Sequence, residues 1–307
     1  MKAIPLFPPS QLNADLKEIW RQYFITFRGL SLLPPRMAYR LVQRAAREKY
    51  CREQSWVEKM IAGVSLAYPD APASFATEMV KAHYDMAARE ILDVFYLSRL
   101  RRRDLGRTLI PCGFDTLSKT QPGRGTIIAM GHYGRPIMLS TALGLSGFKI
   151  GMLSQAVDAR NSGLNPVMQI YLQYKMERTI SQAGGTWLTT LDSPRLLYAA
   201  MERGESIIIM LDVPKVDAKK RIEAEFLGGT LSVPVGILRL LQKTGARLVY
   251  GVTIDHGRVV GAEIRSLPEK PEQAMAAAIQ ELHKDVRANP WQWWQWGQLD
   301  LLWKPHG

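Results

Sequence analysis

Two acid–base side chains follow apolar runs of the sequence. His132 comes just after residues 126–130, in the stretch GTIIAMGHYGRP, and Asp212 directly follows residues 206–211. Short β-branched runs of this kind predict buried strands, and in α/β folds chemistry is commonly located where such strands end. There an imidazole can act as a general base near pH 7. Alternatively, His132 merely caps a helix.

Asp212 permits three interpretations at its strand end. Two strand-end groups on one sheet edge can converge on one cleft, so Asp212 can orient the imidazole of His132 or interact with a cation of a substrate. It can also simply cap the following turn, because Asp is common in turns. The sequence leaves these three roles open.

Glycines and a cation surround the histidine. Gly131 and Gly134 permit close approach of the backbone, and Pro136 suits the first turn of a helix. Arg135 either holds a phosphate of the donor or acceptor or makes an ordinary surface ion pair. The adjacent glycine turn favours phosphate.

Stepping along the chain, the pattern predicts an all-helical first part followed by alternating strands and helices. Further strands are expected at residues 149–153, 247–254 and 258–264, and helices at residues 136–145, 165–182, 193–203 and 234–244. No internal repeat or low-complexity linker is evident. We therefore expect one domain over residues 1–307, with a helical layer at 1–105 and an α/β core at 106–307.

The helical layer is rich in aromatic and basic residues. In residues 16–30, aromatic side chains recur at helical spacing among Lys and Arg. The helix is either an interfacial membrane anchor or is docked on the core. Residues 36–52 and 99–103 carry further arginines, which fit solvated helix faces and ends as well as a phosphate or lipid headgroup site.

Composition narrows the class of partner. The 307 residues contain 40 Lys and Arg against 28 Asp and Glu, a formal charge of +12, which suits nucleic acid, an anionic membrane or an acidic carrier protein. Nucleic acid is disfavoured because no recognition motif is present, and the tryptophans of residues 291–296 fit a packed or interfacial end better than a base-stacking platform. No run reaches the roughly 18 to 20 apolar residues of a membrane-spanning helix, so any membrane contact is expected to be peripheral.

The same composition predicts no metal, cofactor or disulfide. Cys51 and Cys112 have no metal-ligand spacing, and no signal peptide points to an oxidising compartment. Neither a glycine-rich phosphate loop nor a nucleophilic Ser or Cys elbow is present. We expect a cytoplasmic protein with free thiols.

From about residue 30 to residue 303 the ordered motifs resemble the lipid A late acyltransferases, within the lysophospholipid acyltransferase-like superfamily. The matching features are Leu33-Pro34-Pro35-Arg36, Tyr68-Pro69, Gly131-His132-Tyr133-Gly134, Leu164-Asn165-Pro166 followed by Lys175 and Arg178, Asp212, Phe226-Leu227-Gly228-Gly229, Leu240 to Gly245, and Asn289-Pro290-Trp291-Gln292-Trp293-Trp294. The resemblance implies a mixed sheet flanked by helices. It also implies a peripheral enzyme on the cytoplasmic face of the inner membrane that moves a fatty acyl group from acyl carrier protein or a CoA thioester to a glycolipid.

Four of the matching residues are expected to contact substrate. Lys175 and Arg178 come with the resemblance alone. Gly228 and Gly229 stand in the FLGGT segment at residues 226–230. That segment is either a wall of an acyl groove or a plain loop.

One departure from the family pattern concerns the catalytic pair. The family places Glu or Asp five positions after its histidine, and here Ile137 stands there, with no carboxylate between His132 and Asp158. Either another acid such as Asp212 or Asp158 has taken over, or the acceptor is an amine or other nucleophile that needs less assistance, or the chain binds lipid or carrier without catalysing transfer. The segment around Asp158, QAVDAR, also departs from the family motif, so an acceptor unlike lipid A is expected, with Asp158 among the residues that contact substrate.

The function predicted from the sequence is therefore acyl transfer to a hydroxyl or amine of a glycolipid or other atypical acceptor, with His132 as base and Asp212 as its acidic partner. The alternative is a catalytically silent member of the same fold that binds lipid or carrier.

Overall fold

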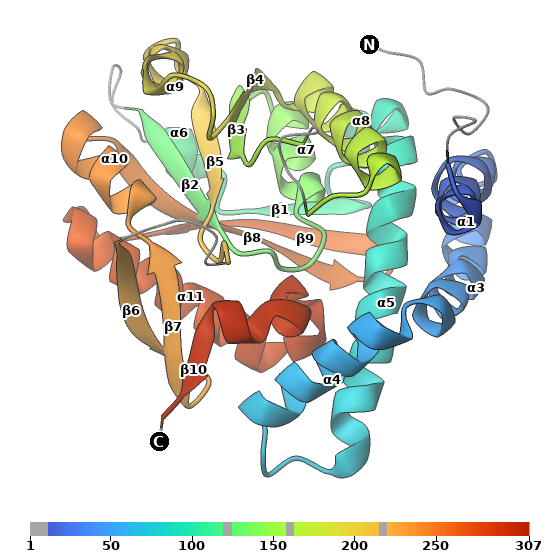
Figure 1. Cartoon of the computed structure of the whole chain (residues 1–307). Coiled ribbons are helices and arrows are strands. Elements are labelled where there is room, and N and C mark those ends of the chain that lie inside the picture. The colour runs from blue at the N-terminus through green and yellow to red at the C-terminus, as the bar shows by residue number, and fades with distance from the viewer. Residues whose placement is uncertain (1–11, 119–124, 158–162, 215–219, 307) are drawn as a thin grey trace.

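The apolar runs expected to be strands lie within one mixed sheet (Figure 1). The computed structural model describes residues 12–118, 125–157, 163–214 and 220–306. In these ranges the sheet has seven strands in the order β1-β9-β8-β2-β5-β3-β4. Their bounds are β1 Leu109–Cys112, β2 Thr126–Met130, β3 Ile150–Ser154, β4 Gly184–Thr189, β5 Ser206–Met210, β8 Arg247–His256 and β9 Val259–Ser266. Only β8 and β9 pair antiparallel; the other neighbours are parallel. The expected mixed sheet flanked by helices is confirmed.

Helices cover both faces of this sheet. Alternate residues of a strand point to opposite sides, and here the side chains on both sides are apolar and need to be covered. In β2, Ile128 and Met130 belong to one hydrophobic cluster, and Ile127 and Ala129 belong to the other. The first cluster includes α7 and α8, and the second includes α9, α10 and α11. The bounds of these helices and of the short α6 are α6 Asp115–Ser118, α7 Ile137–Leu145, α8 Pro166–Ala183, α9 Pro194–Glu202, α10 Gly236–Thr244 and α11 Pro271–Ala288.

The helical layer expected at the N-terminus packs against the sheet domain through a long helix, α5, which contributes to both clusters. The layer runs α1 Ala14–Trp20, a π-helical stretch η1 Arg21–Phe27, α2 Arg28–Leu30, α3 Pro35–Arg52, α4 Gln54–Ala67 and α5 Ala73–Tyr96. Two 3-10 turns follow, η2 Leu97–Arg99 and η3 Arg102–Asp104. None of the described helices is both long and apolar enough to cross a membrane.

The aromatic side chains of the first helical segment are buried, which decides between its two interpretations. Trp20, Tyr23, Phe24 and Phe27 expose 1%, 4%, 2% and 0% of their surface. The ring of Tyr23 lies 4.6 Å from that of Tyr171 in α8. The reading of these four aromatics as a membrane anchor is therefore wrong, because their apolar face is covered by the core.

A small antiparallel sheet and a C-terminal segment complete the fold. The small sheet has the order β10-β7-β6, with bounds β6 Arg221–Phe226, β7 Gly229–Pro234 and β10 Trp303–Pro305. The expected helix start at Pro234 is shifted to Gly236, since β7 includes Pro234. After α11 the chain forms two 3-10 helices, η4 Pro290–Gln292 and η5 Trp294–Leu301. These two helices bring the tryptophan-rich segment, residues 291–296, back to the carboxyl end of β2, a central strand of the large sheet.

Candidate active site

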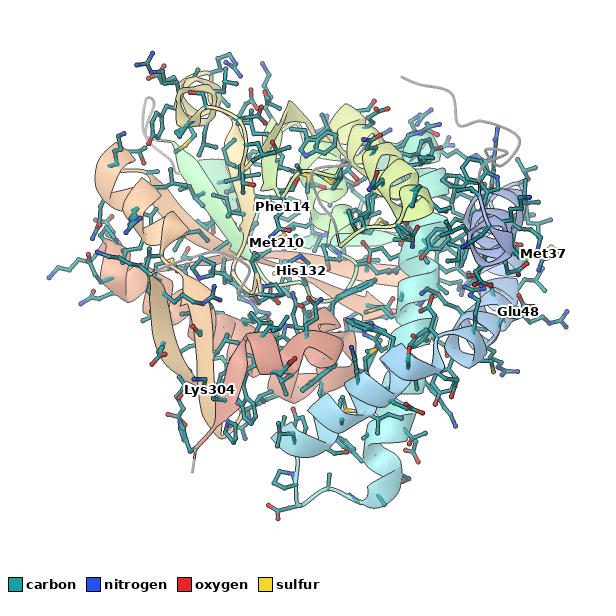
Figure 2. All side chains as sticks on the ribbon, viewed as in Figure 1. Met37, Glu48, Phe114, His132, Met210 and Lys304 are labelled. Carbon is teal, nitrogen blue, oxygen red and sulfur yellow. The ribbon has the colours of Figure 1, made fainter. Side chains whose placement is uncertain are left out.

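The sheet register places His132 and Asp212 side by side. Met130 at the end of β2 is aligned with Met210 at the end of the parallel strand β5. The amide of Leu211 still donates to the carbonyl of Met130, at 2.6 Å. Two residues beyond the aligned methionines come His132, after β2, and Asp212, after β5. His132 lies near the centre of the molecule in Figure 2.

Asp212 holds both the backbone and the ring of His132. The amide of His132 donates to the two carboxylate oxygens at 2.9 and 3.0 Å, and Nδ1 of its ring lies 2.8 Å from Oδ1. The Asp212 side chain is fully buried, whereas 37% of the His132 side chain is exposed. A carboxylate can only accept, so the proton is on Nδ1, and Nε2 is the ring nitrogen that can accept a proton from a substrate.

Two residues of the C-terminal segment, Trp293 and Gln295, donate hydrogen bonds to Asp212, and the sequence did not predict either contact. The indole Nε1 of Trp293 donates to Oδ2 of Asp212 at 2.7 Å. The amide nitrogen of Gln295 donates to the carbonyl oxygen of Asp212 at 2.7 Å and lies 3.0 Å from Nδ1 of His132. The tryptophan-rich run at residues 291–296 is the only sequence signal near these two residues, and it predicts a packed or interfacial end rather than a hydrogen bond to Asp212.

These contacts keep Asp212 ionised. Burial alone would raise the pKa of its carboxyl, but the charge interaction with His132 and the hydrogen bonds from His132 and Trp293 outweigh it and lower that pKa below its ordinary value. A negative carboxylate beside the ring can stabilise the imidazolium that forms when His132 takes up a proton.

The turn that carries His132 is locked by backbone pairing with the C-terminal segment. The amide of Trp294 donates to the carbonyl of His132 at 2.9 Å, and the amide of Gly134 donates to the carbonyl of Gln292 at 2.9 Å. A Cβ on Gly134 would come within 2.1 Å of the Thr253 carbonyl oxygen, and Gly134 has a φ of +62°. Glycine is therefore required here for close approach, as the sequence indicated.

Arg135 is not at a ligand surface. Its side chain is fully buried, with Nη1 2.8 Å from Asp93, Nε 3.1 Å from Asp255 and Nη2 donating to the carbonyl of Gly257 at 2.8 Å. Burial raises the pKa of Asp93 to about 6 even though the guanidinium of Arg135 favours its ionised form. The structure thus places Arg135 in a buried ion-pair network. Both expectations for it, a phosphate contact and a surface ion pair, require an exposed side chain and do not match this position.

The other predicted substrate contacts are not gathered around His132. In α8, the ammonium of Lys175 binds the buried carboxylate of Glu90 at 2.6 Å, and the guanidinium of Arg178 lies 5.0 Å from the ring centre of Tyr174. Among the described residues, no hydrogen bond or ion pair joins Lys175 or Arg178 to His132 or Asp212. Asp158 lies outside the described residues.

Gly228 lies in the turn between β6 and β7, and Gly229 is the first residue of β7. Gly228 has a φ of +68°, and a Cβ on Gly229 would come within 2.4 Å of the Trp303 ring. Gly228 lines an open hollow of about 460 Å³ together with Leu66, Tyr68, Arg287 and other residues. Two aromatic rings lie between this turn and Asp212: Phe226, which ends β6, is 5.2 Å from the ring of Trp293, and Trp293 donates to Asp212.

Ile137 stands where the resemblance led us to expect a carboxylate. It is 2% exposed at the start of α7 and belongs to the hydrophobic cluster that includes α8. The site therefore has its carboxylate at the end of a neighbouring strand instead. Within the described ranges, no group of three or more His, Cys, Asp or Glu side chains is placed to hold a metal ion.

A mixed α/β sheet with a partly exposed histidine at a strand end, backed by a buried carboxylate, is an arrangement suited to general base catalysis. Residues 11–303 match the family described as bacterial lipid A biosynthesis acyltransferase. The chain belongs to this family. A search of the curated proteins finds no match.

Proposed function

We propose that the protein transfers a fatty acyl group from a thioester, carried by acyl carrier protein or CoA, to a hydroxyl or amine of a glycolipid or other lipid-linked acceptor. We further propose that it works as a peripheral protein on the cytoplasmic face of the inner membrane. Family membership supports the class of reaction. The observation that carries the assignment of roles is the 2.8 Å contact between Nδ1 of His132 and Asp212, because it leaves Nε2 free to act as a base.

In this mechanism, Nε2 of His132 takes the proton of the acceptor hydroxyl or amine as the acceptor oxygen or nitrogen attacks the carbonyl carbon of the thioester. The tetrahedral intermediate then expels the thiolate, and the imidazolium returns its proton to the sulfur. The transfer is balanced, with one bond to the acyl carbon formed, the carbon–sulfur bond broken, and one proton moved from acceptor to thiol. Asp212 remains ionised throughout and stabilises the imidazolium.

The competing proposal is a silent protein that binds lipid or carrier. The charged partner of the histidine favours catalysis, since a ring that served only to cap a helix would not need a buried carboxylate fixed by Trp293. The basic charge of +12 suits an acidic carrier as donor.

Mass spectrometry of lipids from cells with the wild-type protein, with His132→Ala and without the protein tests the proposal. We expect an acylated product in wild type alone. Assays of the purified protein with a carrier-bound and a CoA-bound acyl group then identify the donor. Activity that depends on the carrier should fall more steeply with added salt, because screening shortens to about 8 Å at physiological ionic strength. An active His132→Ala variant would exclude the mechanism, and identical lipid profiles in all three strains would favour the silent protein.

A further inference from the structure

The turn between α2 and α3 exposes apolar side chains that the core does not use. Leu32 is 74% exposed, more than any other large hydrophobic side chain in the described ranges, and Met37 in the first turn of α3 is 52% exposed. Met37 lies at the right-hand surface in Figure 2, far from the small sheet in that view. Single exposed apolar side chains are ordinary on a protein surface, so what distinguishes this pair is the set of cations beside it.

Exposed arginines lie near this apolar pair along the chain and next to a segment that contacts it. Arg28, Arg36 and Arg40 are close to it in sequence, and Arg99, which contacts Ser31, is followed by Arg101, Arg102 and Arg103. The two parts of the surface are joined by contacts, because Arg99 donates to the carbonyl of Ser31 and the hydroxyl of Tyr96 donates to the carbonyl of Leu33 at 2.7 Å. Within the described part of the chain, none of these seven arginine side chains takes part in an ion pair.

We propose that this set, Leu32 and Met37 with the seven arginines, is a docking surface for an anionic lipid membrane, an inference that rests on the peripheral location proposed above. The arginines would contact lipid phosphates, and Leu32 and Met37 would enter the boundary between headgroups and acyl chains. An acidic protein would satisfy the arginines but gives no reason for a leucine that is 74% exposed beside them. The surface is distinct from the buried aromatic residues of α1 and η1.

The docking surface is connected to the active-site turn. Tyr39 follows Met37 by two residues in α3, and its hydroxyl lies 3.3 Å from Nη1 of Arg135. Arg135 in turn is three residues from His132 in the locked turn. A protein held to the membrane by this surface therefore keeps its catalytic turn rigidly attached to the docked helix, which suits an acceptor that is itself in the membrane.

Co-sedimentation of the purified full chain with vesicles tests the proposal. The vesicles are phosphatidylcholine alone and phosphatidylcholine mixed with phosphatidylglycerol. We expect binding only to the mixed vesicles, weakened by salt. The variants Leu32→Glu/Met37→Glu and Arg102→Glu/Arg103→Glu should each reduce that binding about tenfold or more. All four residues are exposed, so circular dichroism and the melting temperature should match wild type.

Matched controls come from α9, the turn just before it, and α10; both helices lie at the opposite side of Figure 1 from α3. Leu191→Glu/Leu196→Glu changes two exposed leucines, 57% and 51% exposed, and Arg195→Glu/Arg239→Glu makes the same change of net charge as Arg102→Glu/Arg103→Glu. Both controls should bind like wild type. Equal losses in controls and surface variants would show that the overall charge alone drives binding, which overturns the proposal. Unchanged vesicle binding of the surface variants would also overturn the proposal. It would do so even if those variants lost activity with a carrier-bound donor only.

Discussion

The ring nitrogen Nδ1 of His132 lies 2.8 Å from Oδ1 of Asp212, although the two residues are 80 positions apart in the chain. The contact follows from the parallel register of β2 and β5, which aligns the residues two positions before each of them. A strand end can therefore supply the acidic partner of a histidine when the following helix offers only Ile137.

Replacement of Asp212 by Asn should remove the charge that orients His132 and stabilises its protonated ring. An amide does not select the Nδ1–H tautomer, so Nε2 loses its role as acceptor, and turnover should fall by roughly 10² to 10⁴-fold. The double variant with His132→Ala should be no worse than His132→Ala alone, because groups that act as one unit are non-additive. Asp300→Asn, at an exposed position, is the control for loss of a carboxylate. Steady-state assays check this, and independent, multiplying losses would contradict a catalytic pair.

Replacement of Trp293 by Phe should make Asp212 more basic. The indole donates to the ionised carboxylate, so its loss raises the pKa of Asp212 from its lowered value. A more basic carboxylate takes up a proton at higher pH, and activity should therefore disappear at a higher pH on the acid side. Trp296→Phe is a closely matched control, because that indole is equally buried but donates to the carbonyl of Pro290. Identical pH profiles for the two variants would argue against the role of Trp293.

The placement of His132 and Asp212 at strand ends could be predicted from the sequence because the apolar pattern that marks a strand end is local. Apolar runs mark where β2 and β5 end, and the carboxyl ends of parallel strands lie at the same edge of a sheet, so both residues could be placed at that edge. The glycines around His132 were predictable for the same reason, since close backbone approach demands them. That β2 and β5 are neighbours, which brings His132 and Asp212 into contact, is a long-range pairing that the local pattern does not encode.

The other parts of the site depend on contacts that no local pattern encodes. Trp293 and Gln295 reach Asp212 only because η4 and η5 fold back along the sheet edge. Arg135 looked like a ligand contact because its acidic partners, Asp93 and Asp255, are 42 positions before it and on β8, respectively. The aromatic face of the first helices looked free because the residue that covers it, Tyr171, lies in α8.

Replacement of Arg135 by Met should destabilise the fold. It leaves the buried carboxylate of Asp93 without its cation, while Asp255 keeps the guanidinium of Arg89, and removal of one partner from such a network costs roughly 3 to 5 kcal/mol. The change Arg258→Met removes an exposed guanidinium and should stay within about 0.5 kcal/mol of wild type. Denaturant unfolding measures both. If Arg135→Met instead raised KM with unchanged stability, Arg135 would be a substrate contact after all.

Replacement of Ile137 by Glu tests whether the family's usual carboxylate position is still functional in this chain. Ile137 packs among apolar side chains of α7 and α8, so a glutamate there would be buried without a cation, at a cost on the order of 3 kcal/mol or more. Asp212 already accepts the hydrogen bond from Nδ1 of His132, so a carboxylate at position 137 would find no free ring N–H to hold. We therefore expect lower stability and no gain in turnover. Ile137→Met controls for the change of shape alone and should cost less than about 1.5 kcal/mol. The informative comparison is made in the Asp212→Asn background: if Ile137→Glu restores turnover there, the carboxylate at position 137 can reach His132, and the burial argument is wrong.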